Sequence, residues 1–172
     1  MDELARRDMT TPRSEYQRFG TRERDKQILK GLSLDILVVD DEPLILRPLS
    51  LCLEDSNHRV TTALSGQKAL DLLRGKPFDL VITDLKMPGM DGITLLRRAK
   101  EIRPETKVIL MTASVLSEST RRLVFEEADG FLPKPFSFAE LHRAVSSCLN
   151  SEIMSPDHFK QDFPGSLEAL AP

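Results

Sequence analysis

Short apolar runs alternate with segments of helical spacing five times between residues 33 and 150, and this alternation strongly constrains the fold. Parallel strands must be joined by long crossovers, which are usually helices, so the pattern predicts an α/β fold with a doubly wound, five-stranded parallel sheet and five helices. We expect right-handed crossovers. The expected strands are 36–39, 60–63, 80–83, 108–112 and 131–132, and the expected helices are 44–53, 66–74, 93–102, 118–128 and 137–149.

Local signals support these helices. Ser65 is placed as an N-cap of the second helix, and Ser137 with Glu140 forms a capping-box pattern at the start of the last one. Pro48 is the misfit, because a proline inside a helix removes a backbone hydrogen bond. The first helix should therefore be kinked or begin late.

The two ends of the chain differ from the middle. Residues 1–32 are dense in mixed charge and poor in apolar side chains, which predicts a disordered or loosely helical extension. Residues 151–172 contain Pro, Gly and little periodicity, so we expect a tail or linker. The domain should span 33–150. Our hypothesis for the extension is that residues 14–32 form a helix that packs on the domain or on a second copy.

Composition excludes several functions. The net charge of −3 and the absence of Trp argue against nucleic-acid binding by this chain. No stretch approaches the roughly 20 apolar residues of a membrane span, and the N-terminus lacks a signal core, so we expect a soluble cytoplasmic protein with no membrane association. We expect Cys52 and Cys148 to be buried, reduced thiols. We expect His58, His142 and His158 to lie on the surface.

Polar residues stand where the expected strands end. Asp40 and Asp41 follow the first strand, Asp84 the third, Thr112 closes the fourth, and Lys134 follows the fifth. Open parallel sheets bind ligands at the carboxyl ends of their strands, beside the topological switch point. In the flavodoxin-like strand order 2-1-3-4-5, that point lies between the first and third strands, which carry the aspartates.

These side-chain types point to phosphoryl transfer. Clustered carboxylates repel one another unless a cation lies among them, and Mg²⁺ prefers a few carboxylates together with phosphate oxygens and water. A carboxylate can also act as a nucleophile and form an aspartyl phosphate. A metal, a lysine and a hydroxyl would then stabilise the phosphoryl oxygens.

Four segments together resemble the receiver domain of bacterial response regulators: ILVVDDE, LVITDLKMPGMDG, VILMTAS and ADGFLPKPF. The resemblance covers roughly residues 33–150. It implies that Asp84 is the phosphorylated aspartate and also a ligand of Mg²⁺. It further implies that Asp41 is a direct Mg²⁺ ligand and that Asp40 assists through water. The backbone carbonyl of Lys86 would complete the metal site.

The same resemblance implies further roles near the phosphoryl group. Thr112 matches the switch hydroxyl, and Lys134 the lysine that pairs with the phosphoryl group. Phe131 matches the second, aromatic switch residue, and Ala113 a small residue beside the phosphate. Pro135 matches a proline whose bond to the preceding lysine is frequently cis. Glu127 departs from the family, which often has Gly there.

The function implied is a phosphorylation-dependent signalling switch of a two-component system, with self-phosphorylation and self-dephosphorylation but no external substrate turnover. Its partners would be a histidine kinase or histidine phosphotransfer protein, and a downstream protein or output domain acted on by the surface of the fourth helix, fifth strand and fifth helix. A homodimer through that surface, which includes Arg121 and Arg122, is a further interpretation.

Alternatives remain at this point. The chain could be a constitutive interaction or dimerisation module, or the receiver fragment of a longer regulator or hybrid kinase. A P-loop NTPase is excluded because no G-x-x-x-x-G-K-[ST] motif occurs. A haloacid-dehalogenase-like phosphatase would want a second acid two residues after its nucleophile, where this chain has Lys86.

Overall fold

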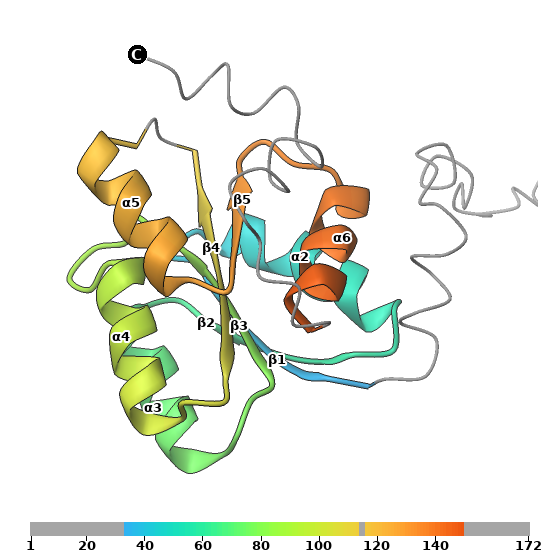
Figure 1. Ribbon diagram of the computed structural model, residues 1–172. Coiled ribbons are helices and arrows are strands. Elements are labelled where there is room, and N and C mark those ends of the chain that lie inside the picture. The colour runs from blue at the N-terminus through green and yellow to red at the C-terminus, as the bar shows by residue number, and fades with distance from the viewer. Residues whose placement is uncertain (1–32, 114–115, 150–172) are drawn as a thin grey trace, which may run out of the picture.

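The computed structural model describes residues 33–113 and 116–149, which form one parallel sheet flanked by helices (Figure 1). The strand order is β2-β1-β3-β4-β5, and every neighbouring pair is parallel. The predicted doubly wound, flavodoxin-like order 2-1-3-4-5 is therefore confirmed. The strands are β1 (Asp35–Val39), β2 (Arg59–Ala63), β3 (Leu80–Asp84), β4 (Lys107–Thr112) and β5 (Gly130–Pro133).

The helices of the described residues cover both faces of the sheet. Helices α2 and α6 lie on one face, and α3, α4 and α5 lie on the other (Figure 1). Every predicted strand and helix is present, with bounds that differ by at most one residue from those expected. The helices are α2 (Pro43–Glu54), α3 (Gly66–Gly75), α4 (Gly92–Ile102), α5 (Glu118–Glu127) and α6 (Phe138–Leu149).

The core lies on both sides of the central strands. All five residues of β3 are buried, and four of the five residues of β1 are buried with it. This explains why these strands are continuous apolar runs rather than alternating ones, since each face is covered by helices. Because β1 and β3 are neighbours at the centre of the sheet, the residues that follow them are held in fixed positions.

The helix caps form as predicted. Ser65 Oγ accepts a hydrogen bond of 3.2 Å from the backbone N–H of Lys68. Ser137 and Glu140 bond reciprocally: Ser137 N–H donates to Glu140 Oε2 at 2.6 Å, and Glu140 N–H donates to Ser137 Oγ at 3.3 Å. Both contacts satisfy N–H groups that have no partner inside the helix.

The expectation of a late start for the first helix is wrong. Helix α2 begins at Pro43 and includes Pro48. Pro43 is favourable at the first position, where the missing N–H is not needed. Pro48 leaves the carbonyl of Leu44 without its helical donor, but both residues are exposed at the start of the helix, where water is a substitute partner.

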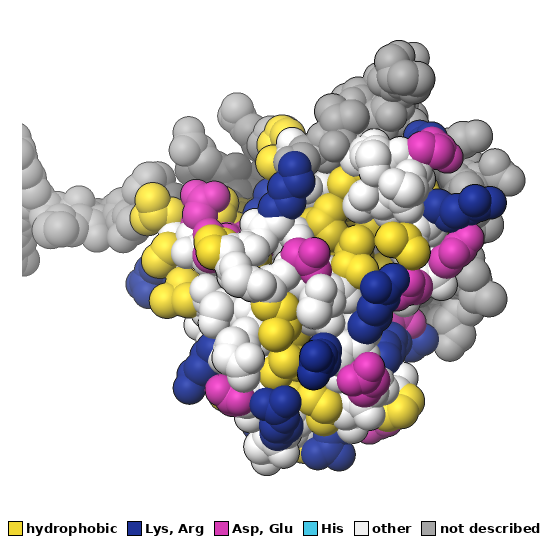
Figure 2. Space-filling model, turned by 90° about the vertical axis from the view of Figure 1, so that its left-hand side faces the viewer, with side chains coloured by type: hydrophobic (Ala, Val, Ile, Leu, Met, Phe, Trp, Pro, Cys, Tyr) yellow, Lys and Arg dark blue, Asp and Glu magenta, His cyan; other side chains and the backbone are white. Residues whose placement is uncertain are grey.

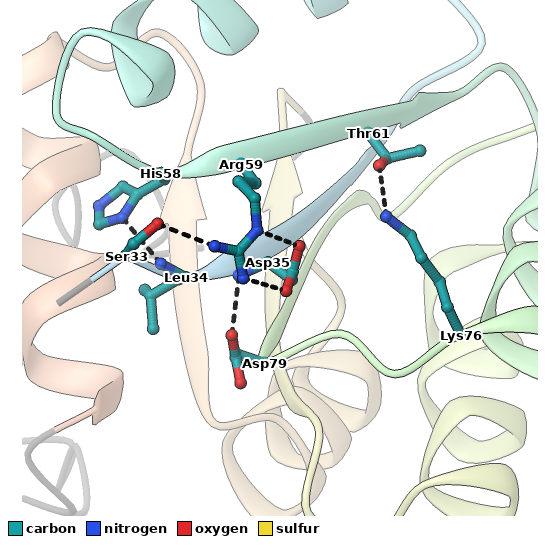
Figure 3. A network of polar contacts seen from close by, with 8 residues as sticks. All are labelled: Ser33, Leu34, Asp35, His58, Arg59, Thr61, Lys76 and Asp79. Carbon is teal, nitrogen blue, oxygen red and sulfur yellow. Dashed lines mark hydrogen bonds and ion pairs between the residues drawn. The ribbon is translucent and has the colours of Figure 1, made fainter.

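A polar network joins the strand starts, at the opposite edge from the predicted site (Figure 3). Arg59 Nε and Nη2 donate to the two carboxylate oxygens of Asp35 at 2.9 and 2.5 Å, and Asp79 Oδ2 accepts from the backbone N–H of Asp35 at 2.7 Å. The hydrogen bond from Arg59 lowers the pKa of Asp35. This network links β1 to its two neighbours, β2 and β3.

The prediction of surface histidines is wrong for His58 and His142. His58 is only 4% exposed, and its Nδ1 accepts a long hydrogen bond of 3.4 Å from the backbone N–H of Leu34 (Figure 3). His142 is half-buried, with Nε2 at 3.3 Å from both Cys52 Sγ and Ser56 Oγ. Both residues lie where α2 and α6 converge on the sheet, a tertiary contact that their sequence neighbours do not reveal. His158 lies outside the described residues.

The two cysteines, Cys52 and Cys148, are buried and form no disulfide, as predicted. Burial raises the pKa of each thiol to about 12, so both are protonated at neutral pH. In the described part of the chain, no helix combines the length and the apolar character that a membrane crossing needs. The predicted tails, 1–32 and 151–172, lie outside the described residues.

Candidate functional site

Four strand ends bring the predicted polar residues to one edge of the sheet. Asp40 directly follows β1, and Asp84 is the last residue of β3. Thr112 is the last residue of β4, and Lys134 directly follows β5. The strands are all parallel, so their carboxyl ends share an edge, and β1 and β3 flank the switch point of the topology.

Lys134 joins the two aspartates. Its Nζ donates to Asp40 Oδ2 at 2.7 Å and to Asp84 Oδ1 at 2.6 Å. Burial acts to lower the pKa of Lys134, but the hydrogen bonds to Asp40 and Asp84 outweigh it, so the pKa is raised and the ammonium stays charged. A partly buried positive charge between two carboxylates is also well placed to neutralise a third anionic group that arrives there.

The remaining carboxylate oxygens are held by the backbone. Asp40 Oδ1 accepts from the N–H of Glu42 at 2.9 Å, and Asp84 Oδ2 accepts from the N–H of Lys86 at 2.6 Å. Each aspartate therefore has one oxygen on the lysine and one on the main chain. Such a carboxylate has little rotational freedom, which preorganises its lone pairs for a reaction at this edge.

The loop after Asp84 is shaped by a glycine that sequence reasoning did not single out. A Cβ atom on Gly92 would lie 2.4 Å from the backbone oxygen of Asp84 and 2.9 Å from Cα of Leu85. Asp91 caps the following helix by accepting from Thr94 N–H at 2.7 Å. The Asp-Gly pair at the start of α4 was the available sequence signal, but the close approach is visible only in three dimensions.

The predicted switch residues are buried beside the site. Thr112 is 2% exposed and Phe131 is 3% exposed, on the adjacent strands β4 and β5. The carbonyl of Thr112 accepts from Lys134 N–H at 2.7 Å, which couples the ends of these two strands. The Lys134–Pro135 peptide bond is cis, as the resemblance implied. Ala113 is exposed at the end of β4.

The predicted metal ligands are brought together only in part. Asp40 and Asp84 share Lys134, whereas Asp41 and Lys86 are exposed next to them in the chain. Within residues 33–113 and 116–149, no three or more His, Cys, Asp or Glu side chains are grouped to enclose a metal. The donors still suit Mg²⁺, which takes a few carboxylates and keeps several waters rather than needing an all-protein cage.

Comparisons with known proteins agree with this fold. Residues 36–146 match the family model described as the response regulator receiver domain. The sensor kinase CckA of Brucella abortus is 32% identical over 135 residues, which are 75% of this chain and 14% of CckA. The transcriptional regulatory protein ZraR of Klebsiella oxytoca is 36% identical over 121 residues, which are 70% of this chain and 27% of ZraR.

A solved structure also resembles this chain. The response regulator receiver domain protein from Clostridium thermocellum has a TM-score of 0.63 and 34% identity, covering 69% of this chain and 95% of that one. The chain therefore belongs to the response regulator receiver domain family, whose members take part in two-component signalling. It spans only a small part of the curated relatives that it matches, CckA and ZraR.

Proposed function

We propose that this chain is a phosphorylation switch in which Asp84 accepts a phosphoryl group from the phosphohistidine of a histidine kinase or phosphotransfer protein. The observation that carries the proposal is the position of Asp84, on the central strand β3 with Lys134 Nζ 2.6 Å from one oxygen. The reaction forms a bond between a carboxylate oxygen of Asp84 and phosphorus, and it breaks the bond between phosphorus and the donor imidazole, which keeps the electron pair.

The residues around Asp84 position its carboxylate and stabilise the phosphoryl group, and they form no covalent bond themselves. Lys134 neutralises charge on the phosphoryl oxygens, and the Lys86 N–H keeps the Asp84 carboxylate oriented for in-line attack. Asp41 directly, Asp40 through water and the Lys86 carbonyl would hold Mg²⁺ beside them. Bound there, the metal ion would offset the negative charge of the carboxylates and of the phosphoryl group.

The response to phosphorylation is a shift between two conformations of the chain that present different surfaces. A phosphoryl group adds a charge of about −2 at neutral pH and new hydrogen-bond acceptors. Thr112 and Ala113, at the end of β4, would face it, and Thr112 would move toward it. Phe131 on the neighbouring strand would then repack and change the surface of α5, β5 and α6. A ligand shifts the balance between two conformations only if it binds one of them more favourably than the other. Here the ligand is the phosphoryl group attached to Asp84.

The output lies with a partner. CckA and ZraR are several times longer than the matched region, so their receiver segments are joined to other domains in the same chain. We propose that the phosphorylated surface of this chain acts on a downstream protein or output domain, or forms a homodimer. A constitutive interaction module is the competing function, and it requires that partner binding does not change on phosphorylation.

The decisive experiment is the intact mass of the protein after incubation with acetyl phosphate and Mg²⁺. The wild type should gain one phosphoryl mass, and Asp84→Asn should gain none. Asp71→Asn is the matched control, because Asp71 is exposed on α3 and its polar partners among the described residues lie on the same helix. A chelator should abolish the gain.

Some phosphoryl donors are specific, so beryllofluoride binding is measured in parallel by amide NMR. Shifts centred on Asp84, Thr112 and Lys134 that need Mg²⁺ would support the same chemistry. Failure of both phosphorylation and beryllofluoride binding would contradict the proposed function and favour the constitutive module.

A further inference from the structure

Helix α5 is weakly anchored by apolar contacts. Val124 is its one fully buried side chain, and Phe125 packs against the core while half-buried. The other helices of the described chain each bury four or more residues. A helix with so little buried apolar area moves at a lower free-energy cost than its neighbours.

The C-terminal end of α5 is tied to α4 by an ion pair. Arg97 Nε and Nη2 donate to the two oxygens of Glu127 at 2.7 and 2.6 Å. This hydrogen-bonded pairing raises the pKa of Arg97 and lowers that of Glu127. A bidentate Arg–carboxylate pair fixes both distance and angle, so it resists rotation as well as separation. The ion pairs Arg121–Glu118 and Arg122–Glu126, by contrast, stay within α5.

The next turn of the chain is anchored to the same helix. Lys100, one turn after Arg97 on α4, donates to Asp129 Oδ2 at 2.6 Å. Asp129 also accepts from Lys107 Nζ at 3.0 Å and from the N–H of Val108 at 2.9 Å. Asp129 therefore attaches the junction between α5 and β5 to α4 and β4. Glu127, the last residue of α5, makes a further contact from the helix itself to α4. Figure 2 shows this face, where basic and acidic side chains stand next to one another around a group of apolar ones.

From these contacts we infer that the Arg97–Glu127 pair is a latch that holds α5 in the arrangement of the unphosphorylated protein. The inference rests on the proposed function, in which the surface containing α5 changes on phosphorylation. The pair joins the helix that moves to one that is packed into the core, and Phe131 lies four residues beyond Glu127. Breaking the latch should remove one contact specific to the inactive state and so favour the active one.

The test is the dissociation constant of beryllofluoride, with Mg²⁺ present, measured by amide NMR on the full chain. Arg97→Gln and Glu127→Gln should each lower it about two- to fivefold, the range expected for a partly exposed ion pair. The double variant should show no further gain, because either change alone breaks the pair. The charge exchange Arg97→Glu with Glu127→Arg should return the constant toward the wild-type value.

The matched control is Arg98→Gln, which removes the same charge from the neighbouring exposed position of α4. It should leave the constant unchanged. An equal change in Arg98→Gln and Arg97→Gln would mean that net charge is responsible, and the latch would be wrong. An unchanged or weakened affinity in Arg97→Gln would also overturn it.

Amide hydrogen exchange without any ligand separates the latch from the proposed function. Arg97→Gln should speed exchange in α5 and leave α4 unaffected. If the wild type neither gains a phosphoryl group nor binds beryllofluoride, the proposed function fails, and the exchange data alone decide the latch. Unchanged exchange in α5 would then overturn it.

Discussion

Residues near the strand ends differ in whether their role in the site can be predicted from the sequence. Asp40, Asp84 and Lys134 are polar residues after apolar runs, so their common location follows from sheet topology. Gly92 is different, because glycine occurs in many loops without a steric reason. Its reason here is the backbone of Asp84 and Leu85, which leaves no room for a Cβ atom.

We predict that Gly92→Ala destabilises the protein by about 1–3 kcal/mol, the usual effect of overpacking a rigid site. The atoms that a Cβ would meet are backbone atoms, which cannot turn away as a flexible side chain would. Urea denaturation would measure the change. Gly75→Ala is the control, because a Cβ atom at Gly75 meets nothing within 4 Å. Equal stability of Gly92→Ala and wild type would disprove the close approach.

At the scale of the secondary-structure elements, two histidines lie near the contact between α2 and α6. His58 precedes β2, and His142 lies on α6 against Cys52 and Ser56 of the α2 region. His58 Nε2 and His142 Nδ1 are buried and have no hydrogen-bond partner among the described residues. Burial lowers the pKa of both histidines, and their mutual repulsion lowers that of His58 further.

This packing predicts a stability that falls in acid. Since the folded pKa values lie below the ordinary value of 6.5, the unfolded chain binds more protons once the pH drops below about 6.5. The free energy of unfolding should therefore decrease as the pH falls through this range, by at most about 1.4 kcal/mol per pH unit for each histidine. Urea denaturation at pH 7.5 and 5.5 measures it.

The variant that tests this origin is His142→Gln, which keeps a polar side chain but does not titrate. The difference in stability between pH 7.5 and 5.5 should be smaller in this variant than in the wild type. A difference of the same size would assign the acid sensitivity to other groups, such as Asp35, whose pKa the hydrogen bond from Arg59 lowers.

At the scale of the whole molecule, residues 33–150 are the proposed domain. The described strands form one five-stranded sheet, and the described helices pack against it. We therefore predict that a fragment of residues 33–150 unfolds in one cooperative transition and binds beryllofluoride as the full chain does. Circular dichroism melting and amide NMR would show this, and a non-cooperative transition would contradict the proposed domain boundary.

A second fragment, which lacks only residues 1–31, tests the hypothesis for the N-terminal extension. If residues 14–32 pack on the domain or on a second copy, the fragment should differ from the full chain in melting temperature or in mass by light scattering. If both properties are unchanged, the packing hypothesis fails while the domain boundary stands.

Periodicity and caps were sufficient to predict a five-stranded parallel sheet and the helix bounds, whereas the strand order came from the resemblance to a flavodoxin-like receiver domain. These features are local, or they follow from general rules of chain topology, so they can be read along one chain. The burial of His58, the close approach at Gly92 and the pair between Arg97 and Glu127 were not predictable in this way. His58 and the Arg97–Glu127 pair make contacts between residues distant in the sequence, which only the packing of helices on the sheet brings together. The approach at Gly92 is local, but it depends on how the loop after Asp84 folds back on that residue.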